Sequence, residues 1–444
     1  MQLNPFQTMT DKYLFLNSNI CFPAEGSINF DTFMNNINYN TGNSYITYSV
    51  IKSLFGKFQQ VDDIKNLWFY QPTQIEIDRI NSEYSKVILI LQDNLRLFDS
   101  YLHHDIYAGL ANFFRKLKIP IVVFSLGSNC FDKNWRSLKD GLNKNLVSLL
   151  RIIADNTVSF GIRGDFTSEI LNSLGIKNHQ VIGCPSYFEM GRNRVINKPN
   201  LKPDFTVLSG GNFSHKSHND IFYVLQDESL LIKSIAFPNE RLLRKDFDSI
   251  GEVLTNAYLH NKVAVFSSMD RWKEFDKRFD FYIGSRVHGA IMAMNAGLPA
   301  IVTNGDTRAE EMCNYFGIPQ MTNLSDDCDL RKLYEDYNVD TVNKKYNHLY
   351  DNYVGWIKSN GLDVVSSNDD MIEDNQGLKY GKTPNCIGDY EISSEVVEGF
   401  LSCYRTKHRS KKLIIFSRLI SYFVIGKKNR KKVRHKIIER FKHL

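Results

Sequence analysis

The sequence predicts an α/β protein with parallel sheets, divided into two domains. Short runs in which every residue is apolar alternate with helix-forming segments, and such runs are typical of strands buried on both faces. At 444 residues the chain is longer than one hydrophobic core usually supports, so we expect two cores. The hydrophobic fraction of 43% fits folded domains rather than a disordered chain.

Residues 279–319 form the clearest strand–loop–helix unit of the sequence. Its first strand is rich in aromatic and β-branched residues, and the helix after it is closed by Gly297 and stopped by Pro299. Alternation of strands and helices of this kind belongs to a parallel sheet. The two strands and two helices are expected at 279–283, 290–296, 300–303 and 310–315.

The loop between the first strand and the first helix of this unit contains the candidate functional residues. Free N–H groups and the helix dipole make such a loop favourable for anions. Arg286 adds a rigid guanidinium suited to a carboxylate or phosphate, and His288 can exchange a proton near neutral pH. In isolation these residues would more often be a surface cation and a core histidine. The strand-to-helix context favours a site, in which Ser285 and Gly289 also contact the substrate.

The first half of the chain contains a similar unit. Apolar runs at 87–91 and 119–124 flank a helix at 108–118 and predict a β-α-β unit. The second run leads into a polar loop that ends in Asn129. An asparagine there could orient a hydroxyl group but could not act as a base.

Arg163 repeats the position of Arg286, because it follows a predicted strand at 157–162 and precedes a helix. The alternative is a surface ion pair of Arg163 with Asp165 or Glu169.

Two sets of motifs resemble the polysaccharide pyruvyltransferase family. Both sets lie within residues 40–320, and together they are specific, whereas either alone would be weak. The first set, which contains Ser-Arg-Val-His-Gly, lies at 285–289, 296–299, 306–312 and 316–319, and the second at 160–176 and 181–185.

The chain departs from the family pattern at three positions. Gly164 interrupts the family segment R-D-x-x-S-x-x-x-L-x-x-x-G-I, and Cys184 replaces the aspartate of the family's G-D-P. Asn43 stands where the glycine turn of the family often carries an acid. Alternatively, Asn43 or Ser44 caps a helix at 46–55.

The resemblance implies a GT-B-like fold, in which two Rossmann-like domains face a cleft. It implies transfer of a pyruvyl group from phosphoenolpyruvate to a sugar of a cell-surface polysaccharide or its lipid-linked precursor, without a metal or cofactor. Arg163 and Arg286 would bind the donor, and His288 would protonate its methylene carbon or stabilise its phosphate. Further substrate contacts would come from Asn129, Arg308 and Glu310.

Composition shifts predict the domain boundaries. A polar, proline-containing linker separates the domains, and a helical pattern within 330–360 is expected to cross back to the first domain. We expect an N-terminal domain at 1–190, the linker at 191–203, a C-terminal donor-binding domain at 204–360, a loop and helix at 361–404 and a tail at 405–444.

The tail is strongly basic. It holds 15 Lys and Arg residues and one acid, a balance of +14, which leaves 40 basic and 48 acidic residues elsewhere. An apolar stretch at 413–425 is too short to span a membrane but suits a peripheral anchor on anionic lipid. Nucleic acid is the competing partner, and the apolar stretch favours the membrane.

The remaining features predict a cytoplasmic protein on the inner face of the cell membrane. No secretory signal is recognisable at the N-terminus. The seven cysteines are scattered without C-x-x-C spacing, which argues against a disulfide framework and a zinc site.

Two rival functions stay open. One is a GT-B glycosyltransferase that uses a nucleotide-sugar, whose diphosphate would also suit Arg286. The other is a degenerate, non-catalytic component of an assembly, suggested by the three departures from the family pattern.

Overall fold

The structure is a computed structural model that describes residues 12–20, 31, 34–35, 37–65, 67–96, 104–130, 142–211, 213–216, 221–229, 231–232, 252–259, 262–266 and 268–365. The predicted tail at 405–444 and nearly all of the loop and helix expected at 361–404 lie outside these residues. Among the helices that are described, none is long and apolar enough to cross a membrane.

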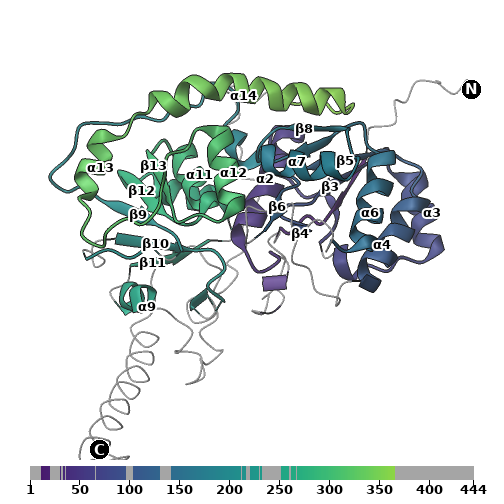
Figure 1. Ribbon diagram of the computed structural model, residues 1–444, viewed down its shortest axis with the longest axis horizontal. Coiled ribbons are helices and arrows are strands. Elements are labelled where there is room, and N and C mark those ends of the chain that lie inside the picture. The colour runs from purple at the N-terminus through teal and green to yellow at the C-terminus, as the bar shows by residue number, and fades with distance from the viewer. Residues whose placement is uncertain are drawn as a thin grey trace, which may run out of the picture.

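The first sheet is parallel, with the strand order β2-β1-β3-β5 (Figure 1). A parallel bridge between Leu126 and Ile162 attaches β7 beyond β5, and β7 pairs in parallel with β8. The strands are β1 (Tyr13–Leu16), β2 (Asp62–Ile64), β3 (Lys86–Ile90), β5 (Ile121–Phe124), β7 (Phe160–Ile162) and β8 (His179–Val181), and a short parallel pair joins β4 (Leu95–Arg96) to β6 (Ser128–Asn129). The helices are α2 (Thr41–Phe55), α3 (Gln74–Glu83), α4 (His104–Lys116), α6 (Lys144–Asp155) and α7 (Asp165–Ser173), with 3-10 turns η1 (Leu67–Phe69) and η4 (Pro185–Phe188).

The second sheet is also parallel, with the strand order β11-β10-β9-β12-β13-β14. Its strands are β9 (Val207–Ser209), β10 (Ile221–Leu225), β11 (Val263–Val265), β12 (Phe281–Gly284), β13 (Ala300–Thr303) and β14 (Gln320–Met321). Its helices are α9 (Glu252–Leu259), α10 (Met269–Asp276), α11 (Val287–Asn295), α12 (Thr307–Phe316), α13 (Leu330–Asp336) and α14 (Asp340–Ser359).

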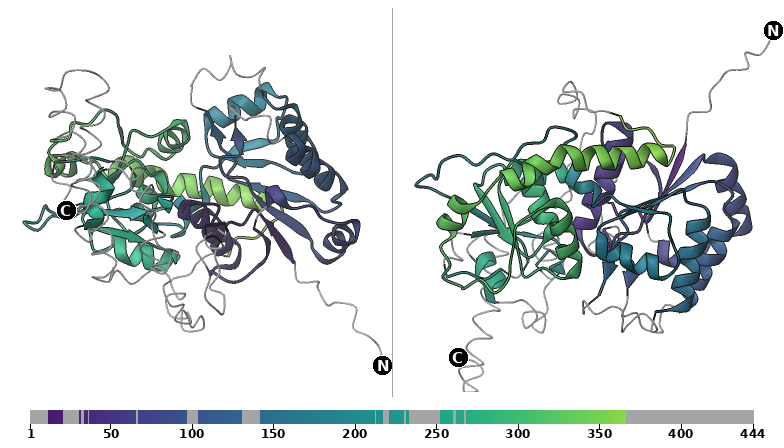
Figure 2. Two further views of the ribbon diagram at one scale, coloured as in Figure 1. Left: turned by 90° about the horizontal axis from the view of Figure 1, so that it is seen from below. Right: turned by 45° about the horizontal axis from the view of Figure 1, so that its top comes forward.

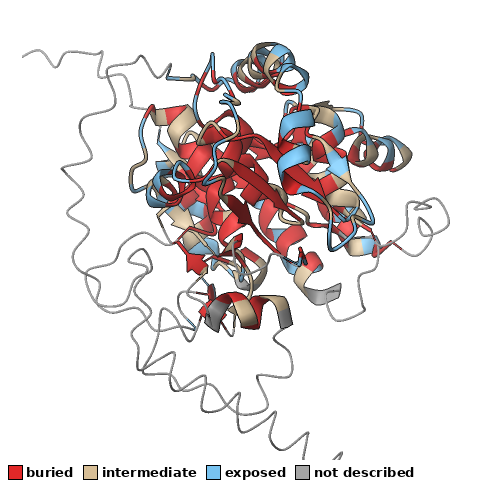
Figure 3. Ribbon diagram, turned by 90° about the vertical axis from the view of Figure 1, so that its left-hand side faces the viewer, coloured by how far each residue is buried: buried red, intermediate tan, exposed pale blue. Residues whose placement is uncertain are grey.

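The predicted α/β class with parallel sheets is therefore confirmed. All residues of β5, β12 and β13 are buried, which explains why these strands carry apolar runs without alternation. Figure 3 shows the buried strands beneath helices whose outer faces are exposed.

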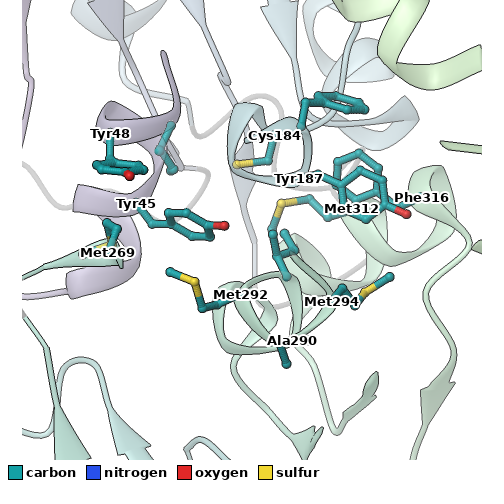
Figure 4. Packing of buried hydrophobic residues seen from close by; sticks show 14 of the residues in the cluster. Tyr45, Tyr48, Cys184, Tyr187, Met269, Ala290, Met292, Met294, Met312 and Phe316 are labelled. Atoms are coloured by element: carbon teal, nitrogen blue, oxygen red, sulfur yellow. The ribbon is translucent and has the colours of Figure 1, made fainter. Parts of the chain in front are cut away.

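One hydrophobic core draws on both sheets. It combines residues of α2 and β5 with residues of η4, α10 and α11 (Figure 4). In this core the ring of Tyr187 stacks on that of Phe316, with centroids 3.9 Å apart. Tyr45 packs against Trp272, which is fully buried.

Helix α14 runs back across the molecule to the first sheet (Figure 2). Its Trp356 packs edge-on against Phe124 of β5, with ring centroids 4.9 Å apart, and donates a hydrogen bond to the Ser159 carbonyl at 3.2 Å. Tyr353 stacks on Phe188 and hydrogen-bonds Ser53 of α2 at 3.1 Å. The crossing predicted for this helix is confirmed, and its aromatic residues join the two sheets.

The loops after the strands of the two sheets meet one another. The Thr41 amide at the start of α2 donates to the Gln226 carbonyl after β10 at 3.0 Å, and Thr307 donates to the Cys130 carbonyl at 2.7 Å. The carboxyl ends of both sets of parallel strands therefore share one region, which is where ligands bind in open α/β sheets. We call this region the seam; its loops are 91–94, 125–130, 163–165, 210–211, 226–228, 285–288 and 304–308.

Candidate functional site

His288 lies near the centre of the seam, in the first turn of α11, and is 8% exposed. Its Nε2 lies 3.6 Å from the sulfur of Cys184, which follows β8. On its other side a Cβ atom added to Gly42 of α2 would lie 2.7 Å from its Nδ1. The imidazole is thus held between the two sheets, and only glycine leaves room for it at position 42.

The imidazole of His288 is neutral at neutral pH. Burial lowers its pKa, and the positive charges of Arg163 and Arg308 lower it further, to about 3, against the opposing charge of Asp93. The expectation that His288 exchanges a proton near neutral pH assumed an ordinary pKa, and burial between two guanidinium groups overturns it. In this state the ring donates or accepts hydrogen bonds but does not act as a strong acid.

Arg163 extends from the end of β7 and is only 3% exposed, so the alternative of a surface ion pair is wrong. Its side chain lies over Gly127, where a Cβ atom would come within 2.6 Å of Cδ. Its Nε donates to the Ser125 hydroxyl at 3.1 Å. The glycine and the hydroxyl fix the guanidinium at the end of the neighbouring strand β5, close enough to affect the pKa of His288.

Arg308 and Asn129 meet on Asp93, a carboxylate that the sequence analysis missed. Nη1 of Arg308 lies 2.6 Å from Asp93 Oδ2, and Nδ2 of Asn129 donates to the same oxygen at 3.0 Å. Arg308 also pairs with Asp306, the N-cap of α12. Asp93 lies two residues after the apolar run at 87–91, and this position near the carboxyl end of a strand could have indicated it from the sequence.

Arg286 reaches across the second sheet. Its side chain lies over Gly210 and Gly211 at the end of β9, where an added Cβ on either glycine would approach its Cγ within 3.3 Å. Its Nη2 then contacts both Asp227 and Glu228 at the end of β10, the latter at 3.1 Å. The arrangement repeats that of Arg163 over Gly127, but Arg286 has two carboxylate partners within the chain.

Ser285 and Gly289 help to hold the start of α11. The Ser285 amide donates to the Gly210 carbonyl at 3.0 Å. Gly289 lies against Tyr282, whose hydroxyl donates to the Arg286 carbonyl at 2.9 Å and would be 2.5 Å from a Cβ at position 289. Gly289 is therefore required for packing.

Glu310 is half-buried in the first turn of α12, while its neighbour Glu311 reaches the other sheet. A carboxylate oxygen of Glu311 accepts from the Thr167 amide of α7 at 2.9 Å, and the Thr167 hydroxyl donates to it as well. Burial raises the pKa of Glu311 to about 7, although these hydrogen bonds and Arg163 oppose the shift. Of these two neighbouring acids, Glu311 is therefore the one that contacts the other half of the molecule, whereas the sequence had pointed to Glu310.

The pH dependence of the free energy of unfolding should reveal the raised pKa of Glu311. Glu311 binds its proton more tightly in the folded chain than at its ordinary pKa of 4.5, so the free energy of unfolding should fall as pH rises from 4.5 to about 7 and then level off. The shift corresponds to about 3 kcal/mol. Urea unfolding of wild type and Glu311→Gln across this range should show the fall only in the wild type. If the free energy of unfolding changed with pH in the same way in both proteins, Glu311 would not be the group responsible.

Three buried residues at the strand ends adopt left-handed backbone conformations. Asn17 after β1, Gln92 after β3 and Ser125 after β5 have φ of 58°, 51° and 59°. Such strain in residues other than glycine clusters at functional sites. The α2 N-terminus also differs from the sequence prediction, because Asn40, rather than Asn43 or Ser44, caps the helix and accepts from the Gly42 amide at 2.8 Å.

A family model described as polysaccharide pyruvyl transferase matches residues 40–307, more than half of the chain. The chain belongs to the polysaccharide pyruvyl transferase family. The match confirms the resemblance based on the sequence motifs and includes Arg163, Arg286 and His288; Arg308 lies just beyond its end. Membership makes the chain a transferase of polysaccharide biosynthesis.

Two solved structures are similar to the chain at low identity. A functionally uncharacterised protein from Klebsiella pneumoniae shares 13% identity, with a TM-score of 0.37 over 71% of this chain and 94% of its own. The glycosyltransferase SnogD from Streptomyces nogalater shares 11%, with a TM-score of 0.29 over 77% and 95%. TM-scores this low support no inference about function. No curated protein matches the chain.

Within the described part of the chain, no group of three or more His, Cys, Asp or Glu residues could hold a metal ion. His215 contacts the Cys328 carbonyl through Nε2 at 2.8 Å.

Proposed function

We propose that this chain transfers a pyruvyl group from phosphoenolpyruvate to a sugar of a cell-surface polysaccharide or of its lipid-linked precursor. The observation that carries the proposal is the fixed, buried guanidinium of Arg163 beside the neutral imidazole of His288. A buried cation without a carboxylate bonded to it gains strongly from an anionic ligand.

The donor has two anionic groups, a carboxylate and a phosphate, and the seam offers a guanidinium from each sheet. In the proposed complex Arg163 binds one group and Arg286 the other, which requires Arg286 to leave Asp227 and Glu228. The N-termini of α7, α11 and α12 begin at the seam and add favourable dipoles. Arg308 and Asn129, joined through Asp93, would position the acceptor sugar.

The proposed arrangement is GT-B-like. The two sheets would be the cores of two Rossmann-like domains, 1–190 and the donor-binding 204–360, joined by the linker at 191–203, with the cleft between them at the seam. Substrates that enter there would meet residues of both sheets at once.

In the proposed reaction a proton adds to the methylene carbon of the donor, a sugar hydroxyl attacks the adjacent carbon, and phosphate leaves. These steps require proton transfer and charge stabilisation, which side chains supply without a metal or cofactor. Because the pKa of His288 is about 3, we assign it to hydrogen bonding of the phosphate rather than to proton donation. The proton must then come from another group.

The proposed location is the cytoplasmic face of the cell membrane. A lipid-linked acceptor is presented there, and the tail at 405–444 has the charge and the apolar stretch of a peripheral anchor on anionic lipid.

Thermal shift with phosphoenolpyruvate, UDP, GDP and CMP tests the donor. A ligand that binds only the folded chain adds about 2.7 kcal/mol at 100 times its Kd. We expect phosphoenolpyruvate alone to raise the melting temperature. Stabilisation by a nucleotide instead would favour a glycosyltransferase, and no response to any of the four would favour a non-catalytic role.

A further inference from the structure

The ion pair of Arg286 with the two acids after β10 is asymmetric. Oε2 of Glu228 accepts from the amides of Gln226 and Asp227 at 2.7 and 3.2 Å, and its Oε1 meets Arg286. Two amides and a guanidinium therefore fix the carboxyl group of Glu228, whose side chain is 12% exposed. Asp227 contacts Arg286 without such backbone donors, and its side chain is 34% exposed. Asp227 is thus the acid that a substrate can reach.

Asp227 also lies close to the reaction centre proposed above. The preceding residue, Gln226, places its Oε1 3.0 Å from the position of a Cβ on Gly42, the same position that is 2.7 Å from His288 Nδ1. Arg286, the partner of Asp227, is two residues before His288 at the start of α11. The loop after β10 therefore borders both the donor-binding arginine and the histidine.

The guanidinium of Arg286 is incompletely satisfied in this position. Its Nε is buried and has no acceptor among the residues that the structure describes, although Nη2 contacts both acids. An unmade hydrogen bond of a buried charged group is costly, so a ligand with more oxygen atoms competes well for this side chain.

Losing Arg286 changes the protonation of the two acids. Burial and the charge of Glu228 already raise the pKa of Asp227, and Arg286 is the charge that lowers it. Tyr282, another titratable group beside Arg286, is buried with its pKa raised far above neutrality, so it contributes no charge. When an anionic donor takes Arg286, Asp227 loses the charge that lowers its pKa and keeps those that raise it, so its affinity for a proton increases.

We infer that Asp227 is the acid–base residue of the pyruvyl transfer, an inference that rests on the proposed function. Phosphoenolpyruvate takes Arg286 from the acid pair, Asp227 binds a proton and gives it to the donor's methylene carbon, and the resulting carboxylate takes the proton of the attacking hydroxyl.

The steps balance without a further reactant. The double-bond electrons of the donor form the new C–H bond, and the cation left on the adjacent carbon accepts the oxygen of the sugar hydroxyl. The proton of that hydroxyl returns Asp227 to its protonated form. The C–O bond to phosphate then breaks, and phosphate leaves with the electron pair. A second hydroxyl of the sugar adds to the cation left on this carbon and closes the ketal, and phosphate takes the proton of that hydroxyl.

Proton uptake on donor binding tests this assignment without an acceptor. Isothermal titration of the full chain with phosphoenolpyruvate at pH 8, in buffers of different ionisation enthalpy, gives the protons bound per ligand. At this pH the phosphate itself, with a second pKa of about 6, carries few protons. We expect uptake approaching about one proton per ligand in the wild type.

Asp227→Asn should still bind phosphoenolpyruvate, at least as tightly, because Arg286 loses a competing carboxylate, but proton uptake should disappear. Asp227→Glu should restore uptake. Asp204→Asn, the same change at an exposed aspartate before β9, should behave like the wild type.

Binding without proton uptake in the wild type, or uptake that persists in Asp227→Asn but is lost in His288→Asn, would overturn the role of Asp227 and leave the proposed function intact. Absence of phosphoenolpyruvate binding in the wild type would overturn both.

Discussion

Arg163→Met is expected to remove the stabilisation by phosphoenolpyruvate while leaving the fold as stable as that of the wild type, or more stable. Removing one member of a buried charge pair costs roughly 2 to 5 kcal/mol of binding, so Kd should rise about thirtyfold or more. In the ligand-free protein, by contrast, Arg163 is a buried cation whose only neighbouring hydrogen-bond acceptor described is the Ser125 hydroxyl. A buried charge without an ionic partner is costly, so we expect its replacement by an apolar residue of similar length to be neutral or stabilising.

Arg192→Met is the matched control, because Arg192 makes an exposed ion pair with Asp351 and neither residue belongs to the loops of the seam. It should bind phosphoenolpyruvate like the wild type. The two variants are compared by thermal shift with and without the donor. A Kd for Arg163→Met within threefold of the wild-type value would exclude Arg163 from donor binding.

The strands of this chain could be predicted well because their signal is local. The second strand expected at 300–303 coincides with β13 (Ala300–Thr303), and its buried residues are apolar regardless of what covers them. The predicted start of α2, at residue 46, was wrong because the structure there does not depend on a local signal. Gly42 and Asn43 are poor helix formers, and their helical conformation depends on packing at the seam, where Gly42 meets His288 and Gln226.

The candidate site was only partly predictable, because its contacts join residues far apart in the sequence. Arg286 and His288 follow from the loop after a strand, but the pairing of Arg286 with Asp227 depends on the strand order β10-β9-β12. The sequence likewise contained Asp93 and Asn129 without indicating that Arg308 would join them. The charge state of His288 follows from burial between two arginines, which a motif does not encode.

Arg163 and Arg286, which each lie over glycine residues of a different sheet, suggest why the chain needs both sheets. Arg163 crosses Gly127 of the first sheet and is held by a neutral hydroxyl, whereas Arg286 crosses Gly210 and Gly211 of the second and is held by two carboxylates. In the proposed complex Arg163 can bind an anion without breaking an ion pair, whereas Arg286 must first leave Asp227 and Glu228. In the proposed reaction, donor binding and proton uptake would thereby be linked through Arg286.

Cys184→Asp is expected to raise the pKa of His288 substantially. The thiol lies 3.6 Å from the imidazole Nε2 and 3.0 Å from the Ser186 hydroxyl. An opposite charge at such a distance shifts a pKa by roughly 1 to 3 units. From its value of about 3, the pKa of His288 should therefore move to between about 4 and 6. NMR titration of the imidazole in both proteins measures the shift directly.

Cys184→Asn separates charge from packing, because asparagine has the shape of aspartate without its charge. If asparagine and aspartate shift the pKa of His288 equally, repacking is responsible and the electrostatic account fails. With aspartate, the affinity for phosphoenolpyruvate should also rise as the pH falls through the new pKa, since an imidazolium attracts the phosphate more strongly than a neutral ring. In the native chain burial and the two arginines keep His288 neutral, which is why we propose Asp227, the more exposed of the two acids beside Arg286, for proton transfer.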